Sequence, residues 1–598
     1  MKTISWDKYS YYIDHKPTFL ISGEFHYFRV PKKDWKKRLE LFKEAGGNCV
    51  ATYIPWILHE PKEGDIRFSD IPERDLEGFL QLCRDMDLFV ICRPGPYQYS
   101  EMRYDGLPGW LCENYPEILA TDINGKAFRS SSVSYLHPVF LEKTRKWFDN
   151  VCPIIAEYTL KKGGPVAFVQ YDNEIMGIHH WYNGFDYNRQ AMGIGHPDGR
   201  YPSFLKERYK TIERLNEAYQ TNYKSFTEVV PFDGFPGNTG EMRTKKDYQD
   251  FYFEMMAEYG EVLVEWMKSC GIDCDIIHNA GSPNMNSFLL ETVKRLGKQF
   301  LLGTDHYYNL GQDFGQNNPT PQHMSRVFIS IEMLRLMGFP PTVMELQAGS
   351  AADWPPITPE DVKCYYYSNL AFGMKGLNYY IFTGGPNPEG IGSFGDDYDY
   401  GAGIGSDGSI RPIYRVQKEF GNFLSENSWL TKAEQVCDFY VGLDWEHSRS
   451  KSYFNKCGFY QFSSSEAWEF LRKGILTTAF QASFSSNFVD LYTDELLSKT
   501  DKPLIIATSV VMPEEVQRRL VKYVQKGGRV LLAPVIPYLD QDFKPCTVLQ
   551  DFLEGTSVTA FNGNYPRVNI GNTKNIHMNG KIFKDTGKFD KEILGSEE

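Results

Sequence analysis

Two acidic side chains stand two positions apart in the stretch AFVQYDNEIMG, and they are Asp172 and Glu174. The apolar run before them predicts a strand, and alternation along a strand points both side chains to the same face. A third acid, Glu345, follows another apolar run in TVMELQAG. A pair of carboxyl groups in one cleft can cleave a glycosidic bond, one protonated to donate to the departing oxygen and one ionised to attack the sugar carbon. Structural ion pairs with Arg29 or Arg93 are the competing interpretation.

The strands that precede these acids must bring them together. Eight short apolar, β-branched or aromatic runs each end in polar or Gly/Pro residues, and stretches long enough for a helix lie between them. They are TFLISGEFHY, GNCVATYIPW, LFVICRPGPY, VAFVQYDNE, CDIIHNAG, FLLGTDHYY, TVMELQAG and GLNYYIFTGG. Eight alternating units predict an α/β fold of the (β/α)8 TIM-barrel type, and no GxGxxG or Walker-type loop follows any of the runs. The site of such a barrel lies at the C-terminal ends of its strands.

A smaller α/β domain is expected after the barrel. The stretch VDLYTDELLSKTDKPLIIATSVVMPEEVQRRLVKYVQKGGRVLLAP predicts strand, helix and strand in the style of an open sheet. We therefore expect a catalytic barrel over residues 1–430 and a second domain over 431–560. The polar, Asn- and Gly-rich residues 561–598 predict no particular structure.

Composition excludes several classes of protein. The formal net charge of −13 over 598 residues leaves no diffuse basic surface for nucleic acid, and the basic stretch PKKDWKKR predicts a solvated helix face. No run of about 18 apolar residues predicts a membrane span, and the N-terminal residues lack the pattern of a signal peptide, so a cytoplasmic protein is expected. The 11 cysteines include no CxxC pair and predict reduced thiols. The 38 tyrosines and 11 tryptophans suit a protein that stacks on sugar rings, although large size alone also explains them.

Three segments carry a resemblance to a known family. They are GEFHYFRVPKKDWKKRLELFKEAGGNCVATYIPWILHEPKEGDIRF, VICRPGPYQYSEMRYDGLPGWL and GGPVAFVQYDNE. In this order they resemble glycoside hydrolase family 35, the β-galactosidase family of clan A. The resemblance implies that Glu174 is the acid/base and that Asn173 binds the sugar 2-hydroxyl. It also implies that Tyr53 and Glu101 hold the sugar ring. Asp172 replaces the first Glu of the family's usual Glu-Asn-Glu, and we expect it to support the site.

Beyond residue 180 the sequence is more similar to the related family 42. The segment MELQAGSAADW resembles that family's nucleophile region, which implies Glu345 as nucleophile and Trp354 as a substrate-binding residue. A tyrosine near the end of the sixth strand commonly binds the nucleophile in this clan, and Tyr307 is the better match, with Tyr308 next to it. The C-terminal stretch resembles the flavodoxin-like domain of family 42, which implies a homo-oligomer, either a dimer or a trimer.

The stretch DDYDYGAGIGSDG lies beyond the eighth run. It resembles a family 35 segment, which implies that Tyr400 or Tyr398 forms a wall of the pocket. Its acids resemble a calcium loop, but the ligand pattern is incomplete and favours a solvated loop.

The resemblance predicts a retaining, exo-acting hydrolase that removes terminal β-galactosyl residues and needs no metal or cofactor. An exo-β-glucosaminidase acting on chitosan oligosaccharides is the first alternative, because relatives that combine such a barrel with a flavodoxin-like domain include such enzymes. A barrel that binds carbohydrate without catalysis is an alternative from another class, but the presence of both acids argues against it.

Overall fold

The computed structural model describes residues 3–182, 184–282, 285–307, 321–350, 357–449, 464–552, 558–560 and 581–583. The chain divides into two compact units. Unit 1 consists of residues 1–192, 252–319 and 327–434, and unit 2 consists of residues 193–251, 320–326 and 435–598. The domain boundaries expected from the sequence at 430 and 560 stay a prediction.

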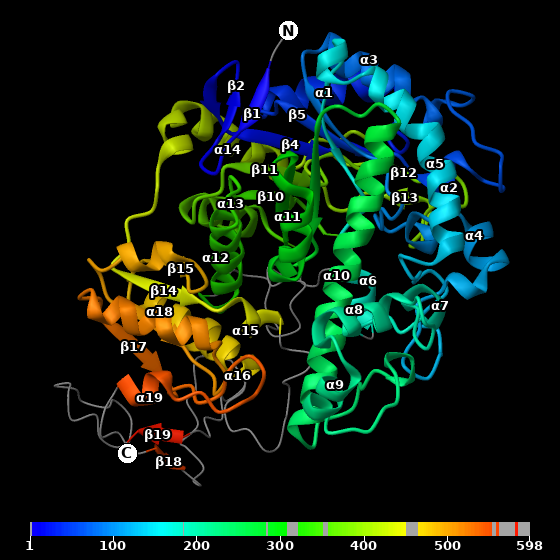
Figure 1. The fold of residues 1–598 in the computed structure, drawn as a ribbon. Helices are drawn as coiled ribbons and strands as arrows, with labels where there is room; N and C mark the ends of the chain where they lie inside the picture. Colours follow the sequence, from blue (N-terminus) through cyan, green and yellow to red (C-terminus); the bar gives the residue numbers. More distant parts are fainter. Residues whose placement is uncertain are drawn as a thin grey trace. The chain divides into compact units, whose positions relative to one another are not determined.

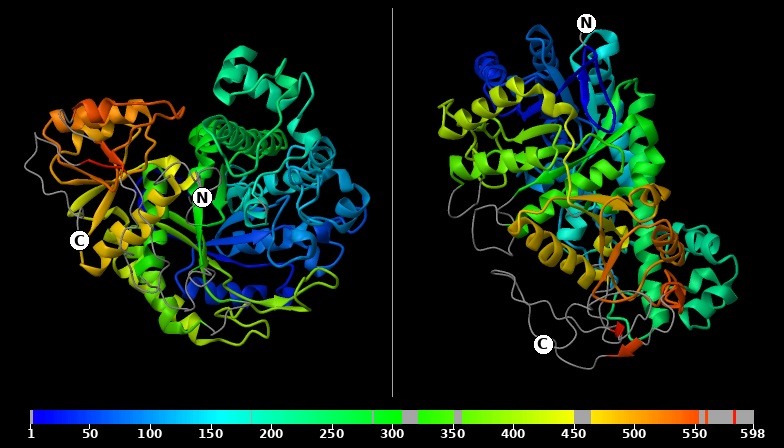
Figure 2. Two further views of the ribbon diagram at one scale, coloured as in Figure 1. Left: turned by 90° about the horizontal axis from the view of Figure 1, so that it is seen from below. Right: turned by 90° about the vertical axis from the view of Figure 1, so that its left-hand side faces the viewer.

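Unit 1 contains a closed barrel of eight parallel strands (Figures 1 and 2). The fold class predicted from the sequence is confirmed, and each of the eight predicted runs contains one strand. Nearly all strand side chains are buried, which is why the runs are continuously apolar instead of alternating. In chain order the strands are β4 (Leu20–Glu24), β5 (Cys49–Tyr53), β6 (Phe89–Arg93), β7 (Val166–Gln170), β8 (Asp275–Ala280), β9 (Phe300–His306), β10 (Thr342–Gln347) and β11 (Gly376–Tyr380), and β11 pairs with β4 to close the barrel.

Helices follow the strands and surround the barrel (Figure 1). Long helices cover the outside of the strands, and short ones begin the loops beyond the strand ends. The bounds are α1 (Trp35–Glu44), α2 (Trp56–His59), α3 (Leu76–Asp85), α4 (Gly109–Asn114), α5 (Pro138–Glu157), α6 (Gly177–Tyr182), α7 (Arg189–Met192), α10 (Thr239–Ser269), α11 (Leu290–Leu296), α12 (Pro321–Leu336), α13 (Pro359–Ala371) and α14 (Pro412–Glu426).

Local sequence sets the ends of the first helices. Helix α1 is followed by Gly46 at φ +86°, a left-handed conformation that glycine adopts without steric cost. Helix α3 begins after Asp75, whose carboxylate accepts a hydrogen bond from the backbone N–H of Gly78 at 3.0 Å. Both helices lie within amphipathic stretches of the sequence, residues 34–46 and 75–87.

A small antiparallel sheet packs at the N-terminal end of the barrel. It consists of β1 (Ile4–Trp6), β2 (Tyr11–Ile13) and β3 (Lys16–Thr18). The Tyr11 hydroxyl lies 2.7 Å from the hydroxyl of Thr342 at the start of β10. The Trp6 indole donates to Asp275 at the start of β8 at 2.9 Å. These contacts close the bottom of the barrel, so a site must lie at the opposite end.

Unit 2 contains an open parallel sheet of four strands in the order β15, β14, β16, β17. This is the order of a flavodoxin-like sheet, as the sequence predicts. The core between the sheet and α18 is apolar and includes Ile506, Leu520 and Tyr523. The bounds are β14 (Phe439–Leu443), α15 (Trp445–Arg449), α16 (Ser464–Glu469), α17 (Thr477–Gln481), β15 (Ser486–Asp490), β16 (Leu504–Ala507), α18 (Glu514–Gln525), β17 (Val530–Ala533), α19 (Val548–Phe552), β18 (Val558–Ala560) and β19 (Lys581–Phe583).

Two further helices belong to unit 2, α8 (Arg200–Tyr209) and α9 (Ile212–Tyr219). The hydroxyls of Tyr209 and Tyr219 both donate to the buried carboxylate of Asp247, at 2.5 and 2.8 Å. Among the residues that the structure describes, none of the helices is long and apolar enough to cross a bilayer.

Candidate active site

Glu174 stands just beyond the end of β7 on a backbone that few residues adopt. Asp172 and Glu174 have φ values of +49° and +44°, in the left-handed region that is uncommon for residues other than glycine. Contacts on both sides fix this turn. The N–H of Asp172 donates to the carbonyl of Gly95 at 2.8 Å, and the N–H of Glu174 donates to Oδ1 of Asn279 at 3.2 Å. An uncommon backbone conformation of this kind persists only where surrounding contacts hold it in place.

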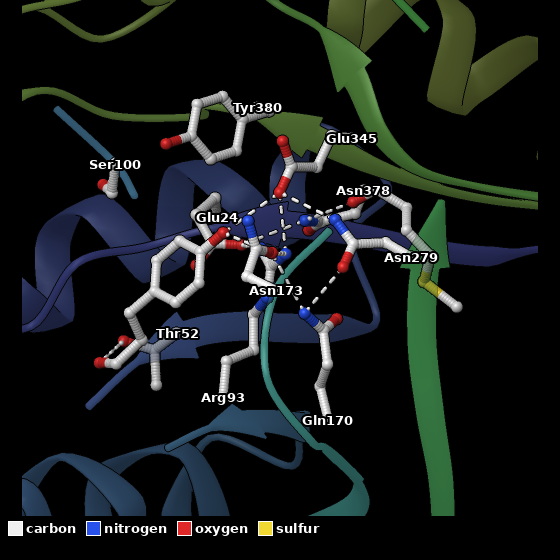
Figure 3. Close-up of polar contacts among 12 residues, drawn as sticks. Glu24, Thr52, Arg93, Ser100, Gln170, Asn173, Asn279, Glu345, Asn378 and Tyr380 are labelled. Atoms are coloured by element: carbon white, nitrogen blue, oxygen red, sulfur yellow. Dashed lines mark hydrogen bonds and ion pairs between the residues drawn. The ribbon is translucent and has the colours of Figure 1, made fainter. Parts of the chain in front are cut away.

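Glu345, on β10, is the point on which polar donors converge (Figure 3). Its Oε1 accepts from Arg93 Nη2 at 2.7 Å, from the Tyr53 hydroxyl at 3.0 Å and from Asn279 Nδ2 at 3.3 Å. Its Oε2 accepts from the Tyr307 hydroxyl at 2.7 Å. Donors from β5, β6, β8 and the end of β9 therefore hold the carboxylate in one orientation.

The carboxyl groups of Glu174 and Glu345 lie close together at the C-terminal ends of the strands. One carboxyl oxygen of each lies within 4.8 Å of the other. Burial of Glu174 raises the pKa of its carboxyl well above the ordinary value, and the charge of Glu345 raises it further. The site thus holds one carboxylate beside a cation and another carboxyl that favours its protonated form.

Asp305 adds a third acid to the site. It lies on β9, and one of its oxygens is within 4.8 Å of oxygens of both Glu174 and Glu345. Asn279 Nδ2 donates to its Oδ2 at 2.7 Å. The neighbouring carboxyl of Asp305 lowers the pKa of Glu174. Burial and the charges of Glu345 and Glu174 raise the pKa of Asp305 well above its usual range.

Arg93 links Glu345 to a fourth buried acid, Glu24 at the end of β4. Arg93 Nη1 donates to Glu24 Oε2 at 2.9 Å, and Asn378 Nδ2 donates to the same oxygen at 3.0 Å. Burial alone would raise the pKa of Glu24, but Arg93, His26 and Asn378 lower it to about 2. Glu24 is therefore an anion that positions the guanidinium, and the guanidinium in turn positions Glu345.

The side-chain amide of Asn173 has a defined orientation. Its Oδ1 accepts from Arg93 Nη2 at 2.7 Å, from the Tyr53 hydroxyl at 3.0 Å and from Gln170 Nε2 at 3.1 Å. Because arginine only donates, the oxygen must face Arg93. The Nδ2 group is left on the other side, 3.4 Å from Oε2 of Glu174. Asn173 therefore offers N–H donors beside the acid.

Asp172 lies beneath this turn and is fully buried. It accepts from the Tyr259 hydroxyl at 2.7 Å, from the N–H of Asn173 at 2.8 Å and from the N–H of Tyr97 at 3.2 Å. Burial raises its pKa to about 7, although these three donors lower it. Through the N–H of Asn173, Asp172 ties the turn that carries Glu174 to Tyr97 and Tyr259.

Glu101 and the rings of Tyr380, Tyr398 and Tyr400 form one wall of the site. The Tyr398 hydroxyl donates to the Glu101 carboxylate, and the Tyr380 hydroxyl lies 3.1 Å from that of Tyr398. The ring of Tyr400 packs 5.4 Å from the ring of Tyr380 and 5.5 Å from that of Tyr398. The guanidinium of Arg29 lies 3.7 Å from the centre of the Tyr398 ring.

This wall adjoins Glu345. The rings of Tyr380 and Tyr307 lie 6.1 Å apart, and the Tyr307 hydroxyl binds Glu345. Burial raises the pKa of Glu101, Tyr398 and Arg29 lower it, and the charge of Glu345 raises it.

The structure places most of the residues predicted from the sequence in one neighbourhood. Glu174, Glu345, Asn173 and Tyr53 lie in one connected network, in which Tyr307 also takes part, whereas Glu101 and Tyr400 form the adjoining wall. Asp172 supports the turn from below. Trp354 and Tyr308 lie outside the described residues. Glu24 and Asp305 could have been found as acids near the ends of predicted strands, but nothing in the sequence shows which strand-end acids meet.

The three acids Glu174, Asp305 and Glu345 are the one group of potential metal ligands found within the described ranges of the chain. A cation there would lie beside Arg93, which already binds Glu345 at 2.7 Å. This proximity favours acid–base chemistry over metal coordination. In the loop after β13 (Asp397–Tyr398), Arg411 forms an ion pair with Asp399, which favours the solvated loop over a calcium site.

A closed (β/α)8 barrel with paired carboxyl groups at the C-terminal ends of its strands defines the class of the glycosidases. Family models agree: residues 10–197 match glycosyl hydrolases family 35, and residues 456–588 match the GLMA-like second domain. The chain is 31% identical to the β-1,2-glucosyltransferase of Ignavibacterium album, over 92% of this chain and 78% of that protein. It is also 31% identical to the exo-β-D-glucosaminidase of Pyrococcus horikoshii, over 91% of this chain and 70% of that protein. The chain belongs to glycosyl hydrolase family 35.

Two further comparisons cover different parts of the molecule. Human β-galactosidase is 40% identical over 29% of this chain and 23% of that protein. The β-galactosidase structure from Marinomonas ef1 superposes with a TM-score of 0.70 at 15% identity, covering 95% of this chain and 84% of that one. The latter likeness shows the fold alone.

Proposed function

We propose that the enzyme cleaves terminal β-glycosides by double displacement, with Glu345 as nucleophile and Glu174 as acid/base. The observation that carries this proposal is the approach of the two carboxyl groups, whose nearest oxygens lie within 4.8 Å. Retaining enzymes hold their carboxyl groups about 5 to 5.5 Å apart, whereas inverting enzymes leave more room for a water molecule. The four donors on Glu345 fix its orientation, and the raised pKa of Glu174 favours its protonated form.

In the first step Glu345 attacks the anomeric carbon while Glu174 gives its proton to the glycosidic oxygen. The C–O bond to the leaving group breaks, and a glycosyl ester of Glu345 forms. In the second step Glu174 removes a proton from water, whose oxygen attacks the same carbon and releases Glu345. Tyr307 and Arg93 hold the nucleophile in line during both steps.

The sugar at the cleavage position is proposed to carry a free 2-hydroxyl. Asn173 offers N–H donors on the side of Glu174, which suits a hydroxyl oxygen and repels the cation of a 2-amino sugar. This orientation argues against a glucosaminide. A terminal β-galactoside is the substrate expected from the resemblance of residues 18–180 to family 35, and the human β-galactosidase match supports it. A β-glucoside is the second candidate, because the relative that covers 92% of this chain is named a glucosyltransferase.

Aryl β-galactoside, β-glucoside and β-glucosaminide, tested side by side, distinguish these substrates. We expect turnover of the galactoside or glucoside, release of a β-configured sugar first, and little turnover of the glucosaminide. Release of the α-anomer would overturn double displacement. Absence of turnover with all three, in folded protein, would favour a carbohydrate-binding barrel.

The C-terminal flavodoxin-like sheet supports the further proposal of a homo-oligomer. Light scattering coupled to size-exclusion chromatography tests it, and a monomer at all concentrations would contradict it.

A further inference from the structure

Trp181 is a large aromatic residue that remains open to solvent next to the acid/base. It lies in α6, the short helix that begins three residues after Glu174, and its side chain is 46% exposed. The mechanism proposed above gives this residue no role.

The indole folds back toward Glu174. Side chains of a helix point toward its N-terminus, so the ring of Trp181 lies over the start of α6. It lies against Gly177, where a Cβ atom would be 2.9 Å from Cη2 of the indole. Gly177 is itself held by Glu174, because its N–H donates to the carbonyl of Glu174 at 2.7 Å. The absence of a side chain at Gly177 therefore lets the indole approach the turn that carries the acid/base.

The helix beneath the indole is firmly anchored. His179 is buried, with Nδ1 2.6 Å from the Tyr252 hydroxyl and Nε2 2.8 Å from the carbonyl of Val133. The ring of Tyr99 packs 5.7 Å from the indole, and its hydroxyl accepts from the N–H of Ile178 at 3.3 Å. One face of Trp181 is thus supported by the protein while the side chain stays partly accessible.

The position of the acid/base determines where the leaving group must lie. Glu174 protonates the glycosidic oxygen, so the sugar on the far side of that oxygen extends past Glu174 and the start of α6. Aromatic rings pack well against the apolar face of a pyranose, and ligand sites commonly combine such rings with a few polar groups. We propose that Trp181 is the platform for the sugar ring on the leaving-group side, and therefore also for an acceptor sugar. This inference rests on the proposed role of Glu174.

A sugar bound on Trp181 changes which hydroxyl group attacks the glycosyl enzyme in the second step. When a sugar ring is bound on Trp181, one of its hydroxyl oxygens can attack the anomeric carbon in place of water. Glu174 takes the hydroxyl proton, the bond between the anomeric carbon and Glu345 breaks, and a new glycosidic bond forms. A bound acceptor therefore diverts the glycosyl enzyme from hydrolysis to transfer.

Trp181→Ala tests the proposal with two probes. Both carry the sugar, galactose or glucose, that the enzyme prefers among the aryl glycosides. A β-linked disaccharide, lactose for galactose or sophorose for glucose, places a ring on the platform. The glycosyl fluoride has a leaving group too small to reach it. We expect kcat/KM for the disaccharide to fall roughly three- to tenfold, the range expected from an aromatic contact, while hydrolysis of the fluoride is unchanged. With the fluoride and added disaccharide as acceptor, the ratio of transfer to hydrolysis should fall by a similar factor.

Trp429→Ala is the matched control. Trp429 is also exposed, at 66%, but it follows α14 next to Leu430, whose carbonyl accepts from Lys375 directly before β11. It therefore lies at the N-terminal end of the barrel, opposite the site. Its substitution should change neither probe.

Gly177→Ala gives a second variant that keeps the indole but displaces it, because the new Cβ would be too close to Cη2. It should reproduce the loss on the disaccharide.

Equal losses of Trp181→Ala on both probes would mean that the indole only supports Glu174, and no loss on the disaccharide would mean that it touches no sugar. Either result overturns the platform. Failure of the proposed function is a different outcome, in which the unmodified enzyme turns over neither probe.

Discussion

A carboxyl oxygen of Glu174 and one of Glu345 lie within 4.8 Å of each other, although the two residues belong to β-strand ends far apart in the sequence. We expect Glu345→Gln to abolish turnover of every substrate, because an amide cannot form the glycosyl ester. Glu174→Gln should lose roughly 10²- to 10⁴-fold on poor leaving groups, the usual range for a general acid, and far less on a dinitrophenyl glycoside. Steady-state rates on both substrates measure this, with the exposed Glu265→Gln as control. Equal losses on both would contradict the role of Glu174.

The interaction between the carboxyl groups of Asp305 and Glu174 predicts a shift in the pH profile. Glu174 must hold its proton in the first step, so activity is present below its raised pKa and is lost as pH rises through it. Asp305 lowers the pKa of Glu174, and Asp305→Ala removes this effect. The pKa of Glu174 should therefore rise, and the alkaline limb of kcat/KM should move to higher pH.

Asp275→Ala is the control for this shift, because Asp275 lies at the other end of the barrel, where it accepts from Trp6. A profile of Asp305→Ala that is lower but not shifted would mean that Asp305 only orients Asn279. Glu345, Arg93 and Glu101 also shift the pKa of Glu174. They are unchanged in both variants, so they cause no difference between the pH profiles.

The buried Asp172 predicts a pH dependence of stability. Its pKa is raised to about 7 in the folded protein, whereas an unfolded aspartate has a pKa of about 4. The native state therefore binds more protons between these values. Stability from this group is fully present below about pH 4 and is lost as pH rises through about 7, by at most about 1.4 kcal/mol per pH unit.

Chemical denaturation at pH 5 and pH 8 measures this loss. Asp172→Asn cannot ionise, so its free energy of unfolding should fall less between the two pH values than that of the unmodified protein. The exposed Asp85→Asn should keep the full dependence. A difference between unmodified protein and Asp172→Asn that is the same at both pH values would contradict the assignment.

Gly281, just after β8, leaves space for the side chain of Glu174. A Cβ atom there would lie 2.8 Å from Oε1 and 2.9 Å from Cβ of Glu174. Gly281→Ala should displace the carboxyl and lower kcat/KM on poor leaving groups by about 10²-fold, as small misplacements of catalytic groups do. Gly237→Ala is the control, since its new Cβ would meet only Glu241 at an ordinary 3.6 Å. Unchanged kinetics of Gly281→Ala would show that Glu174 can move without loss.

The pattern of the sequence was sufficient for the barrel and for the placement of Glu174 and Glu345 at its C-terminal end. Strands buried on both faces must be continuously apolar, so each of the eight runs stands out, and polar residues directly after them must lie at the active end. Glu174 and Glu345 are found in this way because their positions relative to their own strands are local. The resemblance to family 35 then separated Glu174 from Asp172, which strand alternation alone treats as equivalent.

The small sheet β1–β3 was not expected, and neither was the grouping of residues 193–251 with the C-terminal unit. The sheet pairs locally within residues 4–18, but its strands of three residues are too short to give a clear pattern. The grouping of 193–251 depends on contacts between segments far apart in the chain, such as that of Arg243 with Asp542. Periodicity describes only which face of an element is apolar, and it does not identify the element that covers this face.

The sequence by itself determined that eight strands alternate with helices and that acids end two of them. Only the tertiary structure decided which of the polar groups meet. It places Asp305 against Glu174, turns the amide of Asn173 by bonding its oxygen to Arg93, and brings Tyr398 to Glu101. The physical reason is that hydrogen bonds and charge interactions act over a few ångströms in space, whereas the order of residues fixes only their neighbours along the chain.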